Sequence, residues 1–273
     1  MPPLPDLVII GAAKAGTTSL ARWLDDHPEV CVARAKELNF FSYDDVWRRG
    51  LDWYAAQFGD TDARVRCDAS PSYLPAPQAP ERMQQHLPRA RLVALLREPV
   101  DRAYAHYWWL RNWGAESRSF LDVVRTELDG GLTPLGCIDS SRYVDHLERY
   151  AERFPPEQML VLGFDDLSRE PEATFRTVCA FLAISETVPA SVGTAYNPSA
   201  QIRSGRLWRL TGRLLGRSWR DLPRGLDRLL VRYPERPPME AEARDRLQEY
   251  FAPYNERLRA FWGRTEFPWE TPG

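Results

Sequence analysis

The sequence LVIIGAAKAGTTSL, residues 7–20, joins a continuous apolar run to a loop with two glycines and then to the start of a helical pattern. The run Leu7–Ile10 predicts a strand buried on both faces, and Ser19–Asp26 predicts a helix. A loop between such a strand and helix directs backbone N–H groups and the positive end of the helix dipole at an anion. These residues therefore predict an α/β fold with an anion site after its first strand.

The alternation of apolar runs and helical patterns continues along the chain. Further strands are predicted at Val65–Cys67, Arg91–Leu96 and Met159–Leu162. Because helical segments separate these runs, we expect a central parallel sheet flanked by helices, with ligands bound beyond the carboxyl ends of its strands. The remaining predicted helices are Pro80–His86, Val100–Asn112, Glu172–Leu182 and, near the C-terminus, Ala241–Trp262.

Length and charge narrow the class of protein. We predict one domain over residues 1–273, with an α/β core at 7–185 and a helical cover that includes the C-terminal helix at 186–273. Lys and Arg number 36 and Asp and Glu 38, a formal net charge of −2, so the chain is not built to coat nucleic acid. No basic region precedes the first apolar run, and no stretch reaches the roughly 18 apolar residues of a membrane span. We therefore expect a cytoplasmic protein.

The cysteines and histidines show no metal-binding spacing. We expect the histidines to be structural or at the surface, and we predict no metal site. The cysteines lie far apart without a CxxC pair, which argues against a zinc ribbon or a redox pair. Reduced and mostly buried thiols are therefore expected at all four positions, Cys31, Cys67, Cys137 and Cys179.

One segment of the last third is strongly basic. Arg203–Arg236 holds 10 arginines against Asp221, Asp227 and Glu235, a local balance of 10 − 3 = +7. Two interpretations stay open. The segment is either an ordinary solvated helix pair, or a face that contacts an anionic ligand, a carrier protein or a membrane surface.

The lysine in the first loop separates two classes of phosphate-binding enzyme. A nucleoside triphosphatase loop reads GxxxxGK[ST], whereas Lys14 here precedes Gly16. This order disfavours a P-loop nucleotide kinase. The segment KAGTTSL, 14–20, resembles the KxGTTSL loop of sulfotransferases that use 3′-phosphoadenosine 5′-phosphosulfate (PAPS). The resemblance implies a metal-independent reaction in which Lys14 stabilises the leaving group, and a 5′-phosphosulfate site formed by Lys14, Ala15, Gly16, Thr17, Thr18 and Ser19.

A second resemblance concerns a glutamate ahead of two phenylalanines. In KELNFF, 36–41, Glu37 matches the base of carbohydrate-type sulfotransferases, which takes the proton of the acceptor hydroxyl. The alternative is an exposed glutamate paired with Lys36 or an arginine. Phe40 belongs either to the core or to the wall of the acceptor pocket.

The third match follows the strand at 91–96. The segment REPVDRAYAHY, 97–107, resembles the family's RxPxxRAxSxY, whose first arginine and later serine hold the 3′-phosphate. Arg97 fits, and its guanidinium suits a dianion. The serine position is Ala105, which removes a hydroxyl donor worth about 1 kcal/mol. Two interpretations stay open for a later segment. It is either a basic loop that closes over the nucleotide, as in relatives, or an ordinary surface turn, and it consists of Arg203, Ser204, Gly205 and Arg206.

The acceptor is less defined. In DASPSY, 68–73, heparan-type relatives carry a lysine where Ala69 stands, which argues against a sulfated polysaccharide acceptor. Ser70 and Tyr73 either line the site or serve a turn. The three tryptophans Trp108, Trp109 and Trp113 form either an acceptor wall or part of the core.

The resemblance as a whole implies a P-loop-like α/β sulfotransferase. Its expected partners are PAPS and a small-molecule, glycolipid or carrier-tethered hydroxyl acceptor. Two alternatives remain, namely a P-loop nucleotide kinase and a non-catalytic protein that binds partners through the Arg203–Arg236 face.

Overall fold

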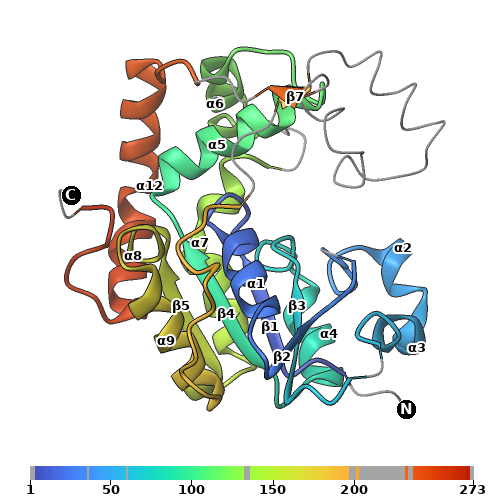
Figure 1. Cartoon of the computed structure of the whole chain (residues 1–273). Helices are drawn as coiled ribbons and strands as arrows, with labels where there is room; N and C mark the ends of the chain where they lie inside the picture. Colours follow the sequence, from blue (N-terminus) through green and yellow to red (C-terminus); the bar gives the residue numbers. More distant parts are fainter. Residues whose placement is uncertain are drawn as a thin grey trace.

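The core of the protein is a five-stranded parallel sheet with the strand order β2-β3-β1-β4-β5, seen in the computed structural model (Figure 1). The structure describes residues 4–35, 37–59, 61–131, 136–196, 201–202, 231–232 and 236–270. The strands are β1 (Leu7–Gly11), β2 (Val30–Val32), β3 (Val65–Ala69), β4 (Arg91–Leu96) and β5 (Met159–Gly163).

Strand β1 is buried along its whole length between β3 and β4. Ile9 pairs with Ala69 on one side and with Val93 on the other. From β1 the chain builds β2 and β3 on one side of the sheet, and β4 and β5 on the other. The strand order therefore reverses beside β1, and parallel sheets bind their ligands beyond the carboxyl ends at such a point.

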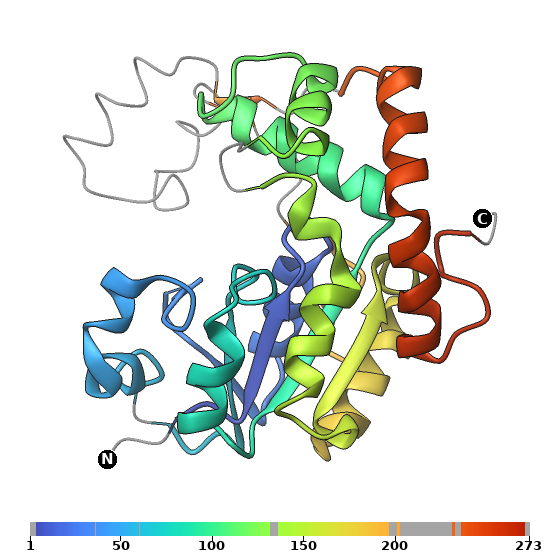
Figure 2. The same cartoon turned by 180° about the vertical axis from the view of Figure 1, so that it is seen from behind.

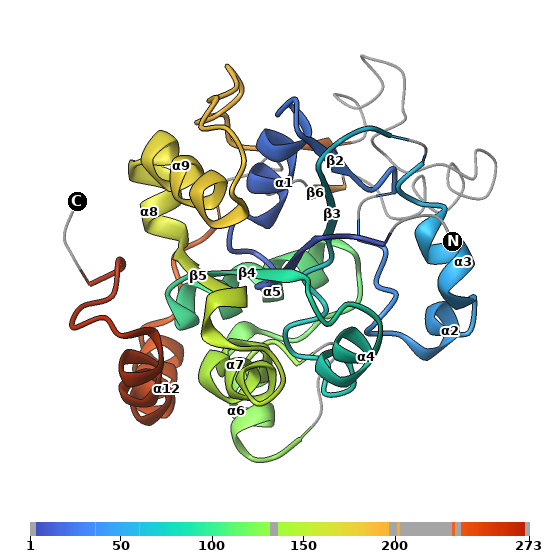
Figure 3. The same ribbon diagram turned by 90° about the horizontal axis from the view of Figure 1, so that it is seen from below.

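Helices cover both faces of the sheet. Figure 3 shows α1 (Thr17–Asp25), α8 (Phe164–Arg169) and α9 (Pro171–Leu182) on one face, and α4 (Ala79–His86) and α7 (Tyr143–Ala151) on the other. Two short helices, α2 (Asp44–Trp47) and α3 (Gly50–Ala55), lie beside the β2 edge.

A second apolar cluster lies beyond the carboxyl ends of the strands. It packs α5 (Pro99–Asn112), α6 (Phe120–Leu128) and the first half of α12 (Ala241–Trp262) around Tyr107 and Phe251. Figure 2 shows α12 running from this cluster back along the sheet. Its last residue, Trp262, donates its indole N–H to the Val161 carbonyl of β5 (3.0 Å).

The predicted fold class is confirmed. The structure has the central parallel sheet, its flanking helices and the C-terminal helix over the predicted residues. Strand β2 and the helices α2, α3 and α8 were not predicted, because three to six residues carry too little periodicity. Helix α6, with nine residues, was not predicted either. The division into 7–185 and 186–273 stays a prediction. The four thiols are free, and Cys67, Cys137 and Cys179 are buried, as expected. Across the described residues, no helix is both long and apolar enough to cross a membrane.

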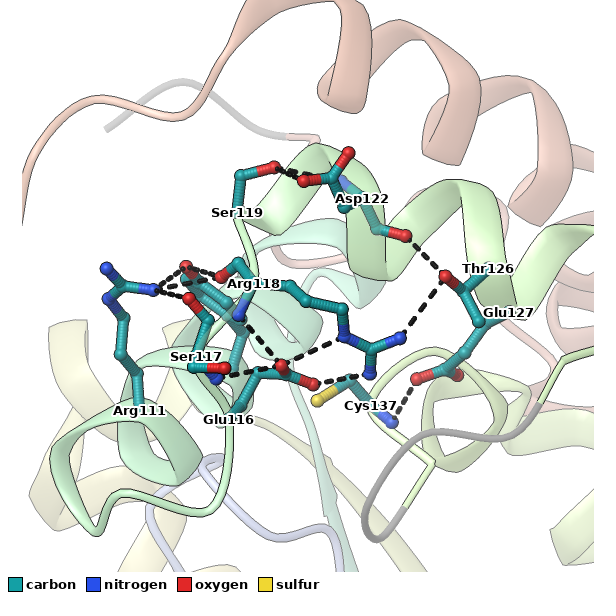
Figure 4. Close-up of polar contacts among 10 residues, drawn as sticks. Arg111, Glu116, Ser117, Arg118, Ser119, Asp122, Thr126, Glu127 and Cys137 are labelled. Atoms are coloured by element: carbon teal, nitrogen blue, oxygen red, sulfur yellow. Dashed lines mark hydrogen bonds and ion pairs between the residues drawn. The ribbon is translucent and has the colours of Figure 1, made fainter.

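A polar network stiffens the turn between α5 and α6 (Figure 4). The buried carboxylate of Glu116 accepts the backbone N–H groups of Ser117 (2.8 Å) and Arg118 (2.9 Å), and it pairs with the Arg118 guanidinium (2.6 Å). At the other end of α6, Glu127 accepts the N–H groups of Cys137 and Ile138. The guanidinium and the two amides hold the pKa of Glu116 at about 2, below the ordinary 4.5.

This pKa predicts an acid-dependent stability. A carboxyl whose pKa is lower in the folded state stabilises the fold above its unfolded value, so this contribution should be complete above pH 4.5 and fall toward pH 2. We expect Glu116→Gln to lower the free energy of unfolding at pH 7 by about 1–2 kcal/mol and to flatten its slope across this window. Urea unfolding at a series of pH values measures both. The exposed Glu266→Gln serves as the control, and an equal effect of the two variants would contradict the assignment.

Candidate active site

The loop after β1 has a backbone that favours anion binding. Lys14 (φ 73°) and Gly16 (φ 89°) are both left-handed, and no side chain caps the first turn of α1. Gly16 is required, because a Cβ there would also lie 2.8 Å from Leu167 Cδ2. A left-handed lysine costs about 1–3 kcal/mol, and such strain concentrates at functional sites.

The members of this predicted phosphosulfate loop differ in exposure. Ala15, Thr17 and Ser19 are buried, whereas Lys14, Gly16 and Thr18 are partly exposed. The Ser19 hydroxyl accepts the Tyr196 N–H (3.0 Å), so it also joins α1 to the segment that follows α9. Within the loop, only Lys14, Gly16 and Thr18 therefore present surface that a ligand could contact.

Helix α5 lies against Lys14. The Lys14 Nζ stands 5.4 Å from the ring centroid of Trp109, whose side chain is 37% exposed. His106, one turn earlier, is buried, and its Nδ1 lies 3.4 Å from the Arg102 guanidinium. Burial, then the charges of Arg102 and Lys14, hold the pKa of His106 well below its ordinary value. A neutral imidazole and an exposed indole therefore border Lys14.

Two guanidinium groups lie near the carboxyl end of β4. Arg97 directly follows the strand, and its guanidinium carbon lies 4.9 Å from the Phe164 ring centroid. The charge of Arg97 acts on partly buried Arg236, whose pKa is lowered first by burial and then by this charge. The residue after Arg236, Pro237, is held at α5, because its carbonyl accepts the Tyr104 hydroxyl (2.8 Å). This bond brings Arg236 near Arg97. Paired guanidiniums suit a dianionic phosphate.

Arg236 was counted in the sequence only as the end of the basic segment. Its proximity to Arg97 depends on a contact between residues 104 and 237, which no local pattern encodes. Ala105, at the family's serine position, is buried and supplies no side-chain donor. Strand β6 (Gln201–Ile202) packs against α5 and pairs with β7 (Val231–Arg232). The predicted loop Arg203–Arg206 begins immediately after β6 and lies outside the described residues, as does most of the basic segment.

The loop that carries Glu37 faces the same end of the sheet. Glu37 (φ 63°) and Asn39 (φ 54°) are left-handed, and the Glu37 side chain is exposed. Burial, and after it the charge of Glu37, raises the pKa of Tyr43, and burial is the main cause that raises the pKa of Asp68, to which Glu37 adds a smaller effect. Asp68 lies in β3, beside β1. The Asn39 N–H donates to Ser70, which directly follows β3, so the loop of the candidate base is attached next to the strand that leads into the candidate phosphosulfate loop.

Of the three residues predicted to contact the acceptor, Ser70 and Tyr73 lie beneath this loop, and Phe40 belongs to it. Ser70 and Tyr73 have no exposed surface, and Phe40 is 1% exposed and stacks on Tyr54 at 4.5 Å. Ser70 Oγ accepts the Asn39 N–H (3.1 Å), and Tyr73 Oη accepts the Phe40 N–H (2.9 Å). The structure therefore shows Ser70 and Tyr73 as supports of the loop, and direct contact of the three residues with an acceptor stays a prediction.

Within the described ranges, no cluster of three metal-ligating side chains occurs. His27, His106 and His146 are buried, in agreement with a structural role. His27 Nε2 lies 3.1 Å from the Ser185 carbonyl, and His146 Nε2 lies 3.0 Å from the Asp139 carbonyl.

Comparison with known families decides the class. Residues 4–196 match the model of the sulfotransferase domain. The chain belongs to the sulfotransferase domain family. Its class of enzyme is therefore confirmed, which disfavours both the nucleotide kinase and the non-catalytic binding protein.

The sulfotransferase has relatives of two kinds. It is 29% identical to the mouse bifunctional heparan sulfate N-deacetylase/N-sulfotransferase 1, with 93% of this chain covered but only 29% of that protein. It is 25% identical to mouse heparan sulfate glucosamine 3-O-sulfotransferase 5, covering 96% of this chain and 73% of that one. A solved sulfotransferase from Alicyclobacillus acidocaldarius matches 98% of this chain and 100% of its own at 27% identity, with a TM-score of 0.73. The sulfotransferase fold is thereby shown.

The two guanidiniums predict how a phosphate ligand binds. We expect Arg236→Gln to weaken binding of adenosine 3′,5′-bisphosphate (PAP) about tenfold, because it removes one charge-assisted contact to the 3′-phosphate. Binding of 5′-AMP, which lacks that phosphate, should not change. Isothermal titration calorimetry measures both, with Arg89→Gln at the exposed amino end of β4 as the control. Unchanged PAP affinity in Arg236→Gln would remove Arg236 from the site.

Proposed function

We propose that this sulfotransferase moves the sulfuryl group of PAPS to an acceptor hydroxyl, with Lys14 and Glu37 in the catalytic roles. One observation carries the proposal. Two cationic positions, the Lys14 loop and Arg97, follow the adjacent strands β1 and β4, and the charge of Arg97 acts on a second guanidinium, that of Arg236. PAPS carries anionic groups on both its 5′ and its 3′ side, and it matches two such positions.

The donor would lie across the carboxyl ends of these strands. Its 5′-phosphosulfate contacts the backbone N–H groups at the start of α1 and the ammonium of Lys14, and its 3′-phosphate contacts Arg97 and Arg236. The segment Arg203–Arg206 is the remaining proposed contact, since it follows a strand that packs on α5. Lys14 holds the sulfuryl end against the indole of Trp109.

The reaction is an in-line displacement at sulfur. The acceptor oxygen forms a bond to sulfur while the bond from sulfur to the bridging oxygen of the 5′-phosphate breaks, and PAP leaves. Glu37 takes the proton of the acceptor hydroxyl as it attacks. Lys14 neutralises the charge that develops on the bridging oxygen, because its ammonium lies at the partly buried loop that receives the phosphosulfate.

The acceptor is proposed only as a class. Relatives named above act on heparan sulfate, but Ala69 here lies buried at the end of β3, where it presents no charge to an anionic polysaccharide. We therefore propose a small-molecule, glycolipid or carrier-tethered acceptor. The ring centroids of Trp109 and Trp113 lie 6.3 Å apart, and these residues are 37% and 40% exposed. We propose that they contact the apolar part of the acceptor beside Lys14.

The assigned base predicts a loss of turnover without a loss of donor binding. Glu37→Gln should lower kcat by about 10²- to 10⁴-fold, because the acceptor hydroxyl keeps its proton. The PAP dissociation constant should stay within twofold of wild type. PAP release from PAPS is measured with a panel of neutral acceptors, namely a phenol, a sterol, a hydroxylated fatty acid and a chitooligosaccharide. Asp45→Asn, another exposed carboxylate near Tyr43, is the control.

The assigned lysine predicts a different pattern. Lys14→Met should lower kcat as strongly and also weaken binding of PAP, because the ammonium meets the donor in both states. Full activity of either variant with an acceptor that the wild type uses would refute that residue's role. Wild-type protein that binds PAP but turns over with no acceptor would refute the catalytic proposal itself.

A further inference from the structure

The backbone of the Glu37 loop is in a conformation that needs outside support. Glu37 and Asn39 both have a positive φ, 63° and 54°, with Leu38 buried between them. Asparagine tolerates this region, but for glutamate it is strained. Such a backbone persists only where surrounding contacts fix it more than once.

These contacts come from one short segment, Ser70–Tyr73, directly after β3. The Asn39 N–H donates to Ser70 Oγ (3.1 Å), and the Phe40 N–H donates to Tyr73 Oη (2.9 Å). Ser72 Oγ donates to Asn39 Oδ1 (2.6 Å), and Asn39 Nδ2 donates back to the Glu37 carbonyl (2.9 Å). The carbonyl of Glu37 is thus connected through Asn39 to the end of β3.

The two hydroxyls that hold the loop are themselves oriented by Asp68. This carboxylate has no exposed surface and accepts three O–H groups, from Ser70 (2.7 Å), Tyr73 (2.7 Å) and Tyr54 (2.8 Å). A hydroxyl has a single hydrogen, so a hydroxyl that donates to Asp68 presents only lone pairs to its other neighbours. Asp68 therefore fixes Ser70 and Tyr73 as acceptors, which the N–H groups of Asn39 and Phe40 require.

We propose that Asp68 is a positioning residue that holds the Glu37 carboxylate at the acceptor site through the hydroxyls of Ser70 and Tyr73. The inference rests on the function proposed above, because it assigns Glu37 the role of base. It extends that function by tracing the geometry of the base to a buried group that does not touch substrate. It also gives Ser70 and Tyr73 a role in kcat in place of one in acceptor binding.

The chain offers a matched pair of variants for the test. Tyr54 and Tyr73 are both fully buried, and both donate to Asp68 Oδ2. Only Tyr73 also accepts a backbone N–H of the loop, that of Phe40. Tyr54→Phe and Tyr73→Phe therefore remove the same kind of bond to Asp68, and only the second releases the loop.

Two readouts separate positioning from a general loss of structure. We expect Tyr73→Phe to lower kcat at least tenfold with the KM for PAPS and for the acceptor within twofold of wild type, and Tyr54→Phe to leave kcat within twofold. Hydrogen exchange followed by mass spectrometry should show faster exchange in residues 37–42 of Tyr73→Phe alone. Turnover is PAP release from PAPS with whichever panel acceptor the wild type uses. If Tyr73→Phe does not fold, Ser70→Ala replaces it. This variant removes the acceptor of the Asn39 N–H, and the same two measurements are made on it.

The outcomes are distinct. Equal kcat losses in the two tyrosine variants, or unchanged exchange of residues 37–42 in Tyr73→Phe, would overturn the proposal. A higher acceptor KM with unchanged kcat would also overturn it, because Tyr73 would then contact the acceptor itself. If the wild type uses no acceptor, the proposed function fails, and the exchange comparison still decides whether the Tyr73 hydroxyl holds the loop.

Discussion

The pairing of β1 with strands on both sides is the constraint on which the site depends. Beyond the register itself, the Ala12 N–H donates to the Leu95 carbonyl (2.7 Å), and the Leu74 N–H donates to the Ile10 carbonyl (2.8 Å). These bonds tie the start of the loop after β1 to the end of β4, and the last part of β1 to the turn that follows β3. Because all five strands are parallel, the Lys14 loop, the Arg97 turn and the Ser70–Tyr73 support of Glu37 all emerge at one edge.

Among the described residues, four that are not glycine have a positive φ, and three of them, Lys14, Glu37 and Asn39, lie in loops at this edge of the sheet, whereas Ala183 ends α9. Lys14 and Glu37, the two residues proposed for catalysis, are both left-handed, although neither is a glycine or an asparagine. Each conformation is held by rigid neighbours: the Lys14 loop by β1 and α1, and the Glu37 loop by hydroxyls bonded to buried Asp68. These contacts thereby offset the cost of the strained backbone at the two residues before substrate binds.

The sequence predicts those parts of the site that follow strands directly. Lys14 and Arg97 each come after a long apolar run, so their place at the carboxyl edge follows from the pattern of the chain. Arg236 and the link from Asp68 to Glu37 could not be predicted, because they depend on contacts between residues about 30 to 130 positions apart. Ser70 and Tyr73 were found as polar residues after a strand, but the direction of their hydroxyls is set by burial around Asp68.

The central claim is that the two cationic positions together bind one nucleotide with phosphates on both its 5′ and its 3′ side. Isothermal titration of the wild-type chain with PAP, 5′-AMP and Mg-ATP, each with and without a metal chelator, tests it most directly. We predict micromolar binding of PAP that is much tighter than that of 5′-AMP and unaffected by the chelator. Equal affinity for PAP and 5′-AMP, or tighter binding of Mg-ATP that the chelator abolishes, would contradict the account.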